Sequence, residues 1–118
     1  MTNQEAFNSV WERLVTKAYL GRCETNGKCQ YINEDLTNQC AIGYLMPDEL
    51  CIHVENNLDR CDSNILSVVD EFKEVSDFFS GVDPILLKEM QNIHDIWYDD
   101  AKNRLKHLAP QYSLTCPV

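Results

Sequence analysis

The apolar residues of the first twenty positions recur at helical spacing. Between about Asn3 and Tyr19 they lie three or four positions apart, as on one face of an amphipathic helix. They are Phe7, Val10, Trp11, Leu14, Val15 and Ala18. Thr2 and Glu5 have the spacing of a capping box at the start, and Gly21 is a stop signal. The pattern predicts a first helix over this range.

A second apolar stripe with helical spacing lies in the second half of the chain. Its members are Ile65, Val68, Val69, Phe72 and Val75. Asp62 or Ser63 offers an N-cap before it, and Ser80-Gly81 follows as a stop signal. We therefore predict one continuous helix between these signals.

A third stripe follows Asp83-Pro84, which is an N-cap and then a proline at the first helical position. The stripe consists of Leu86, Leu87, Met90, Ile93, His94 and Trp97. We expect a break at Tyr98-Asp99-Asp100 and then a last helix that Pro110 ends. The inward residues of that last helix are Ala101, Leu105 and Leu108.

The stretch from Gln39 to Leu50 is the most apolar part of the first half. Gly43 would let another backbone come close, and Pro47 ends one element or opens the next. We predict a short buried helix at about 40–45, a kink and a second short helix from Pro47. A buried strand followed by a helix is the alternative, because short apolar runs are ambiguous.

Residues 22–40 have a different character. Asn26-Gly27 is a strong hairpin signal, and residues 28–32 alternate between polar and apolar side chains. The whole pattern predicts a mainly α (α+β) fold, with four to six helices around one core and a small β-hairpin near residues 22–40. We expect residues 1–118 to form a single helical domain.

Composition narrows the possible partners. The chain has 118 residues and a net charge of −9, with 10 basic and 19 acidic residues. This charge argues against direct binding to nucleic acid or an anionic membrane, and permits a basic protein partner. No apolar run approaches the ~20 residues of a membrane helix, and the start lacks the pattern of a secretory signal. We therefore predict a cytoplasmic protein whose six cysteines are reduced thiols.

Three stretches together resemble a known family. They read Cys29-Gln30-Tyr31, then Cys40-Ala41-Ile42-Gly43-Tyr44-Leu45-Met46-Pro47-Asp48-Glu49, then Leu87-Lys88-Glu89-Met90-Gln91-Asn92-Ile93-His94-Asp95. This order resembles a family of small uncharacterised phage and prophage proteins, which have Leu-Gln where this chain has Met90-Gln91. The resemblance implies a small accessory protein in a bacterial cytoplasm and carries no known activity.

Four acidic residues are candidates for a binding surface. Asp70, Glu71, Glu74 and Asp77 are expected on the solvent side of one helix. They form either a solvated face or a docking surface for a basic host protein. The second interpretation predicts a non-enzymatic protein that binds and modulates or inhibits a bacterial host protein, in host takeover or anti-defence.

Cys29, Cys40 and His94 support an alternative function. They could converge in a small zinc- or thiol-dependent enzyme, with His53, Cys51 or Asp95 completing a metal site. The chain lacks the Cys-x-x-Cys spacing of zinc ribbons and thioredoxin motifs. Each of the three is otherwise explained as a buried core residue. The main prediction therefore includes no catalytic residue and no cofactor.

Overall fold

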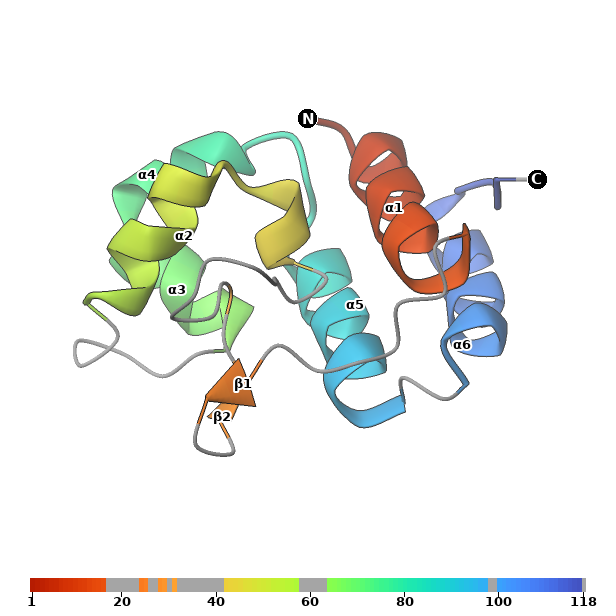
Figure 1. The fold of residues 1–118 in the computed structure, drawn as a ribbon. Coiled ribbons are helices and arrows are strands. Elements are labelled where there is room, and N and C mark those ends of the chain that lie inside the picture. The colour runs from red at the N-terminus through yellow and green to blue at the C-terminus, as the bar shows by residue number, and fades with distance from the viewer. Residues whose placement is uncertain are drawn as a thin grey trace.

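The computed structural model describes residues 1–16, 24–25, 28–29, 31, 42–57, 64–97 and 100–117, without the side chains of 24–25, 28–29 and 95–97. Six α-helices lie within these ranges (Figure 1). They are α1 (Asn3–Trp11), α2 (Asp48–Glu55), α3 (Ile65–Glu71), α4 (Lys73–Phe78), α5 (Pro84–Trp97) and α6 (Ala101–Leu108). The predicted mainly α fold is confirmed.

The predicted capping box opens α1. The backbone N–H of Glu5 donates to Oγ1 of Thr2 (3.1 Å), and the backbone N–H of Thr2 donates to Oε1 of Glu5 (2.9 Å). After Trp11 the chain continues as a π-helical turn over Glu12–Thr16. The predicted end of this helix at Tyr19 lies outside the described residues.

Two short strands lie in the range where the sequence predicts a hairpin. β1 (Glu24–Thr25) pairs antiparallel with β2 (Lys28–Cys29), with Glu24 opposite Cys29. Each strand is two residues long. Most of the buried apolar residues in the described part of the chain belong to helices.

Residues 42–46 of the apolar middle stretch are mostly buried, and only part of this segment is helical. A single 3-10 turn spans Gly43–Leu45, and α2 follows directly after Pro47. Ile42, Leu45 and Met46 are all buried in the core. Residues 40 and 41, where the sequence predicts the start of a helix, lie outside the described residues.

The predicted single helix from residue 65 onward is wrong, because Phe72 divides it into α3 and α4. Phe72 has extended backbone angles (φ −108°, ψ 107°), and its buried ring meets the His53 ring edge to face at 5.6 Å between centroids. The helical spacing of the apolar residues continues across Phe72, and no glycine or proline marks the break. The sequence pattern therefore does not reveal it. Asn64 is the N-cap of α3, and its Oδ1 accepts from the backbone N–H of Leu66 (2.9 Å).

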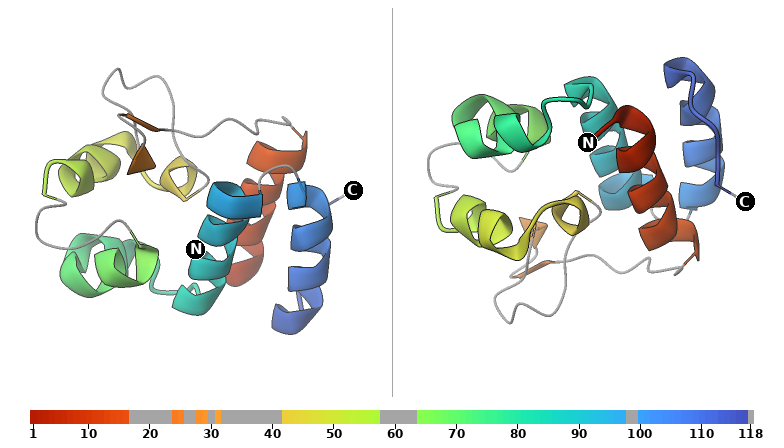
Figure 2. Two further views of the ribbon diagram at one scale, coloured as in Figure 1. Left: turned by 90° about the horizontal axis from the view of Figure 1, so that it is seen from below. Right: turned by 90° about the horizontal axis from the view of Figure 1, so that it is seen from above.

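Helix α5 is the central element. It contacts α1, α3 and α6, so it joins the helices at the two ends of the molecule (Figures 1 and 2). Its predicted start is confirmed, since Oδ1 of Asp83 accepts from the backbone N–H of Ile85 (2.9 Å). One continuous cluster of buried apolar residues connects these helices.

The last α-helix ends at Leu108, just before Pro110, as the sequence predicts. The chain then continues as a 3-10 turn over Ala109–Tyr112, which the sequence did not predict. Ser113, with φ at 56°, then turns the chain back, and the backbone N–H of Thr115 donates to Oε1 of Gln4 on α1 (3.0 Å). Within the described ranges, none of the helices combines the length and the apolarity needed to cross a membrane.

Candidate functional site: an acidic groove between α2 and α4

Residues from the three motif stretches meet in the core around Tyr31. A Cβ at Gly43 would overlap the carbonyl oxygen of Tyr31 and lie 2.7 Å from its carbonyl carbon. Nε2 of Gln91 donates to the Tyr31 hydroxyl (3.2 Å), and the Tyr31 backbone N–H donates to Oε2 of Glu55 (2.7 Å). We call Tyr31, Gly43, Glu55 and Gln91 the Tyr31 cluster. Tyr31, Gly43 and Gln91 come from the first, second and third motif stretch. Their presence in these stretches is therefore explained by packing and hydrogen bonding.

Gln91 also fixes the start of α3. Its Oε1 accepts from the backbone N–H of Ile65 (2.8 Å), which is a group that a helix cannot satisfy internally. One buried amide thus holds both Tyr31 and the first turn of α3. The close backbone approach that the sequence predicts at Gly43 is found in this cluster.

The cysteine and histidine candidates do not form a described site. Cys40 and the side chain of Cys29 lie outside the described residues, while His94 is 1% exposed on α5. Cys51 is fully buried, and its Sγ donates to the Gly43 carbonyl (3.3 Å). Among the side chains that the structure describes, no three His, Cys, Asp or Glu residues come close enough to hold a metal ion.

The four predicted acidic residues are all exposed, but they occupy two helices. Asp70 and Glu71 end α3, and Glu74 and Asp77 belong to α4. Nζ of Lys73 lies 2.8 Å from Oδ2 of Asp77 in an exposed ion pair. Glu74 faces α2 instead, with Oε2 3.8 Å from Nε2 of His53.

The side chain of Glu74 forms one wall of a shallow surface groove. This acidic groove lies between α2 and α4 and has a volume of about 470 Å³. Its lining residues are Pro47, Glu49, Leu50, His53 and Glu74. The half-buried Leu50 side chain and Pro47 supply apolar surface, and Glu49 and Glu74 supply exposed carboxylates. The other three predicted acidic residues lie nearby in sequence but do not line it.

The helices around the groove carry a large excess of negative charge. α2, α3 and α4 carry seven carboxylates and one lysine. The carboxylates are Asp48, Glu49, Glu55, Asp70, Glu71, Glu74 and Asp77. Glu55 points inward to Tyr31, where burial raises the pKa of its carboxyl above the ordinary value of 4.5, while the hydrogen bond from Tyr31 opposes the shift. The remaining six are exposed and attract cationic groups over a Debye length.

The sequence did not identify Pro47, Glu49, Leu50 and His53 as parts of one site with Glu74. The acidic start of α2 is visible as Asp48-Glu49, but nothing local places it across from α4. The contact of His53 with Phe72, at the α3–α4 break, brings the two helices together. That contact depends on the tertiary fold.

Fold and groove together define a mainly α-helical protein with an acidic, partly apolar surface groove. Comparison with models of protein families, with curated proteins and with solved structures found no match to this chain. The functional argument therefore depends on the chain's own residues.

Proposed function

We propose that this chain is a small acidic phage-type accessory protein, which binds and modulates a bacterial host protein without catalysing a reaction. The acidic groove between α2 and α4 is the single observation that supports binding. The resemblance of the three motif stretches to phage proteins is the reason for a host protein as the partner. The work of the molecule is then done on its negatively charged surface.

The chemistry of the groove indicates what the partner presents. Leu50 and Pro47 would accept one apolar side chain, and Glu49 and Glu74 would flank it with negative charge. A segment with one large apolar residue between lysines or arginines is complementary to this arrangement. Apolar anchors supply most of the affinity at protein interfaces, while rim charges mainly raise the association rate.

The test is capture from a bacterial lysate followed by a binding measurement with the captured protein. Two variants separate the contributions: Glu49→Lys/Glu74→Lys reverses the rim, and Leu50→Asn makes the floor polar. Glu12→Lys/Glu89→Lys is the matched control. Both residues are exposed and lie outside the acidic groove, and the double substitution changes the net charge by as much as the rim variant does.

We expect the rim variant to slow association and flatten its salt dependence, and the floor variant to speed dissociation. The control should bind as the wild type does. Equal losses in the rim variant and the control would show unspecific attraction between opposite net charges. Unchanged binding in both groove variants would exclude this groove as the docking surface.

The alternative enzyme, built on Cys29, Cys40 and His94, has no supporting observation among the described residues. His94 is buried, and among the described side chains no three His, Cys, Asp or Glu residues lie close enough together to hold a metal ion. Elemental analysis of the purified protein for zinc tests that alternative directly. One bound zinc ion per chain would favour the metal-dependent enzyme over the binding protein.

A further inference from the structure

The segment that follows the last helix is held against α1 by a single side chain. We call residues 114–117 the strap. The amide of Gln4, in the first turn of α1, contacts both backbone groups of Thr115. Its Oε1 accepts from the Thr115 N–H (3.0 Å), and its Nε2 donates to the Thr115 carbonyl (2.9 Å). The amide of Gln4 therefore pairs with the backbone of the strap in the way that a peptide group would.

The side chains of the strap alternate between the protein interior and the solvent. Leu114 and Cys116 are half-buried and pack against the core, whereas Thr115 between them is exposed. This period of two is typical of an extended segment with one face on a surface. We call the surface that the strap covers, with Gln4 as its polar group, the strap seat.

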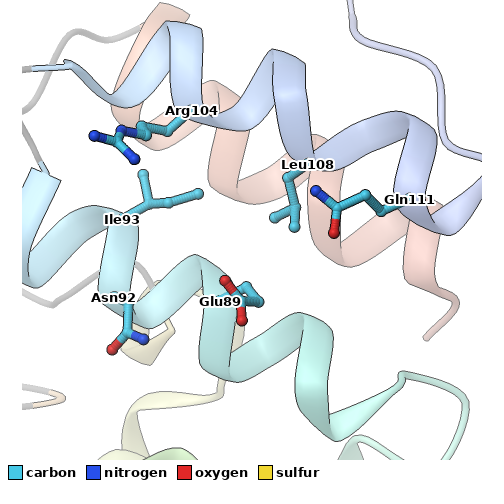
Figure 3. A pocket seen from close by; sticks show the side chains of 6 residues that line it. All are labelled: Glu89, Asn92, Ile93, Arg104, Leu108 and Gln111. Atoms are coloured by element: carbon cyan, nitrogen blue, oxygen red, sulfur yellow. The ribbon is translucent and has the colours of Figure 1, made fainter.

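Helix α6 is fixed independently of the strap. Ile93 of α5 and Leu108 of α6 point into the space between these two helices (Figure 3), and both side chains are buried in the core. The strap begins only after the 3-10 turn over Ala109–Tyr112 that follows α6. Because these contacts precede the strap in the chain, it can leave its seat while α6 stays on α5.

Ser113 is the hinge between α6 and the strap. Its φ of 56° and ψ of 39° are left-handed, and no other non-glycine residue in the described ranges has a positive φ. A Cβ is disfavoured in this conformation, because it lies too close to the following carbonyl oxygen. The turn is held by the Leu114 N–H, which donates to the Ala109 carbonyl (2.9 Å). An ordinary negative φ at Ser113 would direct the strap away from the seat of its own chain.

We propose that the strap of one chain occupies the strap seat of a second copy, and the reverse, in a strap-exchanged dimer. The contacts of the strap with Gln4 and the core are reformed between the chains, so that exchange keeps them. Both hinges then leave the left-handed conformation. The seat already fits the sequence of this strap, which favours a second copy over an unrelated peptide. The reciprocal contacts give a closed dimer with two-fold symmetry.

The strap of the same chain competes with exchange. A short linker gives it an effective concentration on the order of 1 mM, so exchanged dimers form at high protein concentration or when the hinge is biased. Substitution of Ser113 biases the hinge in both directions. Valine should promote exchange, because β-branched residues avoid a positive φ. Glycine should suppress exchange, because it adopts this conformation without strain.

The experiment is small-angle X-ray scattering of the full chain, which measures the molecular mass at protein concentrations up to about 1 mM. The dimer fraction of the wild type should rise with concentration. In Ser113→Val the concentration at half-dimerisation should fall by about tenfold or more, and in Ser113→Gly it should rise. A Ser113→Val chain that stays monomeric, or equal dimerisation of the two variants, would overturn the proposal.

A second substitution in the Ser113→Val chain identifies the contact. Gln4→Ala removes the hydrogen bonds of the seat and should restore the monomer. Lys102→Ala is the control, because Lys102 is an exposed residue of α6 that does not contact the strap through a described hydrogen bond, and the dimer should persist. A dimer that survives Gln4→Ala would exclude the exchanged contact.

Isotope labelling tests the same contact directly. In a mixture of ¹³C-labelled and unlabelled Ser113→Val chains, nuclear Overhauser effects between Gln4 of one chain and Thr115 of another are expected. Their absence in the dimer would show that the chains associate by another surface. The acidic groove lies on α2 and α4, outside the strap and Gln4, so these results leave the docking proposal untouched.

Discussion

The backbone of Tyr31 lies directly against the α-carbon of Gly43, and no side chain fits between them. The atoms that a Cβ would meet are the carbonyl oxygen, the carbonyl carbon and the α-carbon of Tyr31. Backbone atoms cannot swing aside as a flexible side chain can. Two segments that the sequence separates by twelve positions are therefore joined at a contact that only glycine permits.

We predict that Gly43→Ala destabilises the protein by about 1–3 kcal/mol, the usual cost of overpacking a buried site. Chemical denaturation measures the free energy of unfolding. Ser76→Ala is the control, because Ser76 is exposed on α4 and its substitution should leave the free energy of unfolding nearly unchanged. Equal effects of the two substitutions would contradict a tight contact at Gly43.

Gln91 and Tyr31 should be energetically coupled. Gln91→Leu leaves the backbone N–H of Ile65 and the Tyr31 hydroxyl without their described partner, which should cost about 1–3 kcal/mol. Tyr31→Phe should cost about 1 kcal/mol. In the double variant the losses should not add, because both single changes break the same Nε2–hydroxyl bond. Additive losses in a double-mutant cycle would show that this bond contributes nothing.

Glu55 should make stability depend on pH in a specific direction. Burial raises the pKa of its carboxyl in the folded state above 4.5, so the folded protein binds the proton more tightly than the unfolded chain. Its contribution to the free energy of unfolding therefore falls as pH rises from about 4.5 through the raised pKa. Glu55→Gln keeps an acceptor for the Tyr31 N–H and removes this dependence.

Denaturation of wild type and Glu55→Gln at pH 4 and at pH 7 tests this linkage. The variant should gain stability relative to the wild type at the higher pH. Relative stabilities that do not change with pH would contradict a raised pKa. A relative gain for the wild type at pH 7 would show that the hydrogen bond from Tyr31 outweighs burial.

Cys51 should react slowly with thiol reagents in the folded protein. It is fully buried, and its thiol donates to the Gly43 carbonyl, whereas Cys116 is half-buried near the chain end. Peptide mapping by mass spectrometry after brief labelling measures both sites in one sample. Urea should make the two rates similar, and equal rates without urea would contradict the packing around Cys51.

Local patterns were sufficient for most of the helices. The capping box of Thr2 and Glu5 and the Asp83-Pro84 start are formed by neighbours in sequence, so their physics is local. The close approach at Gly43 was also expected, because a glycine in an apolar stretch favours backbone contact. Its partner, Tyr31, was not.

The sequence by itself determined a mainly helical chain with an apolar interior, an acidic exterior and its principal helix starts, because periodicity and capping act within a few residues. Only the tertiary structure decided the break at Phe72, the hydrogen bonds of Gln91 and the acidic groove between α2 and α4. Each of these depends on contacts between distant segments. The contact of the buried Phe72 ring with His53 and the hydrogen bond from the Ile65 N–H to Gln91 join separate helices, so no periodic sequence pattern reveals them.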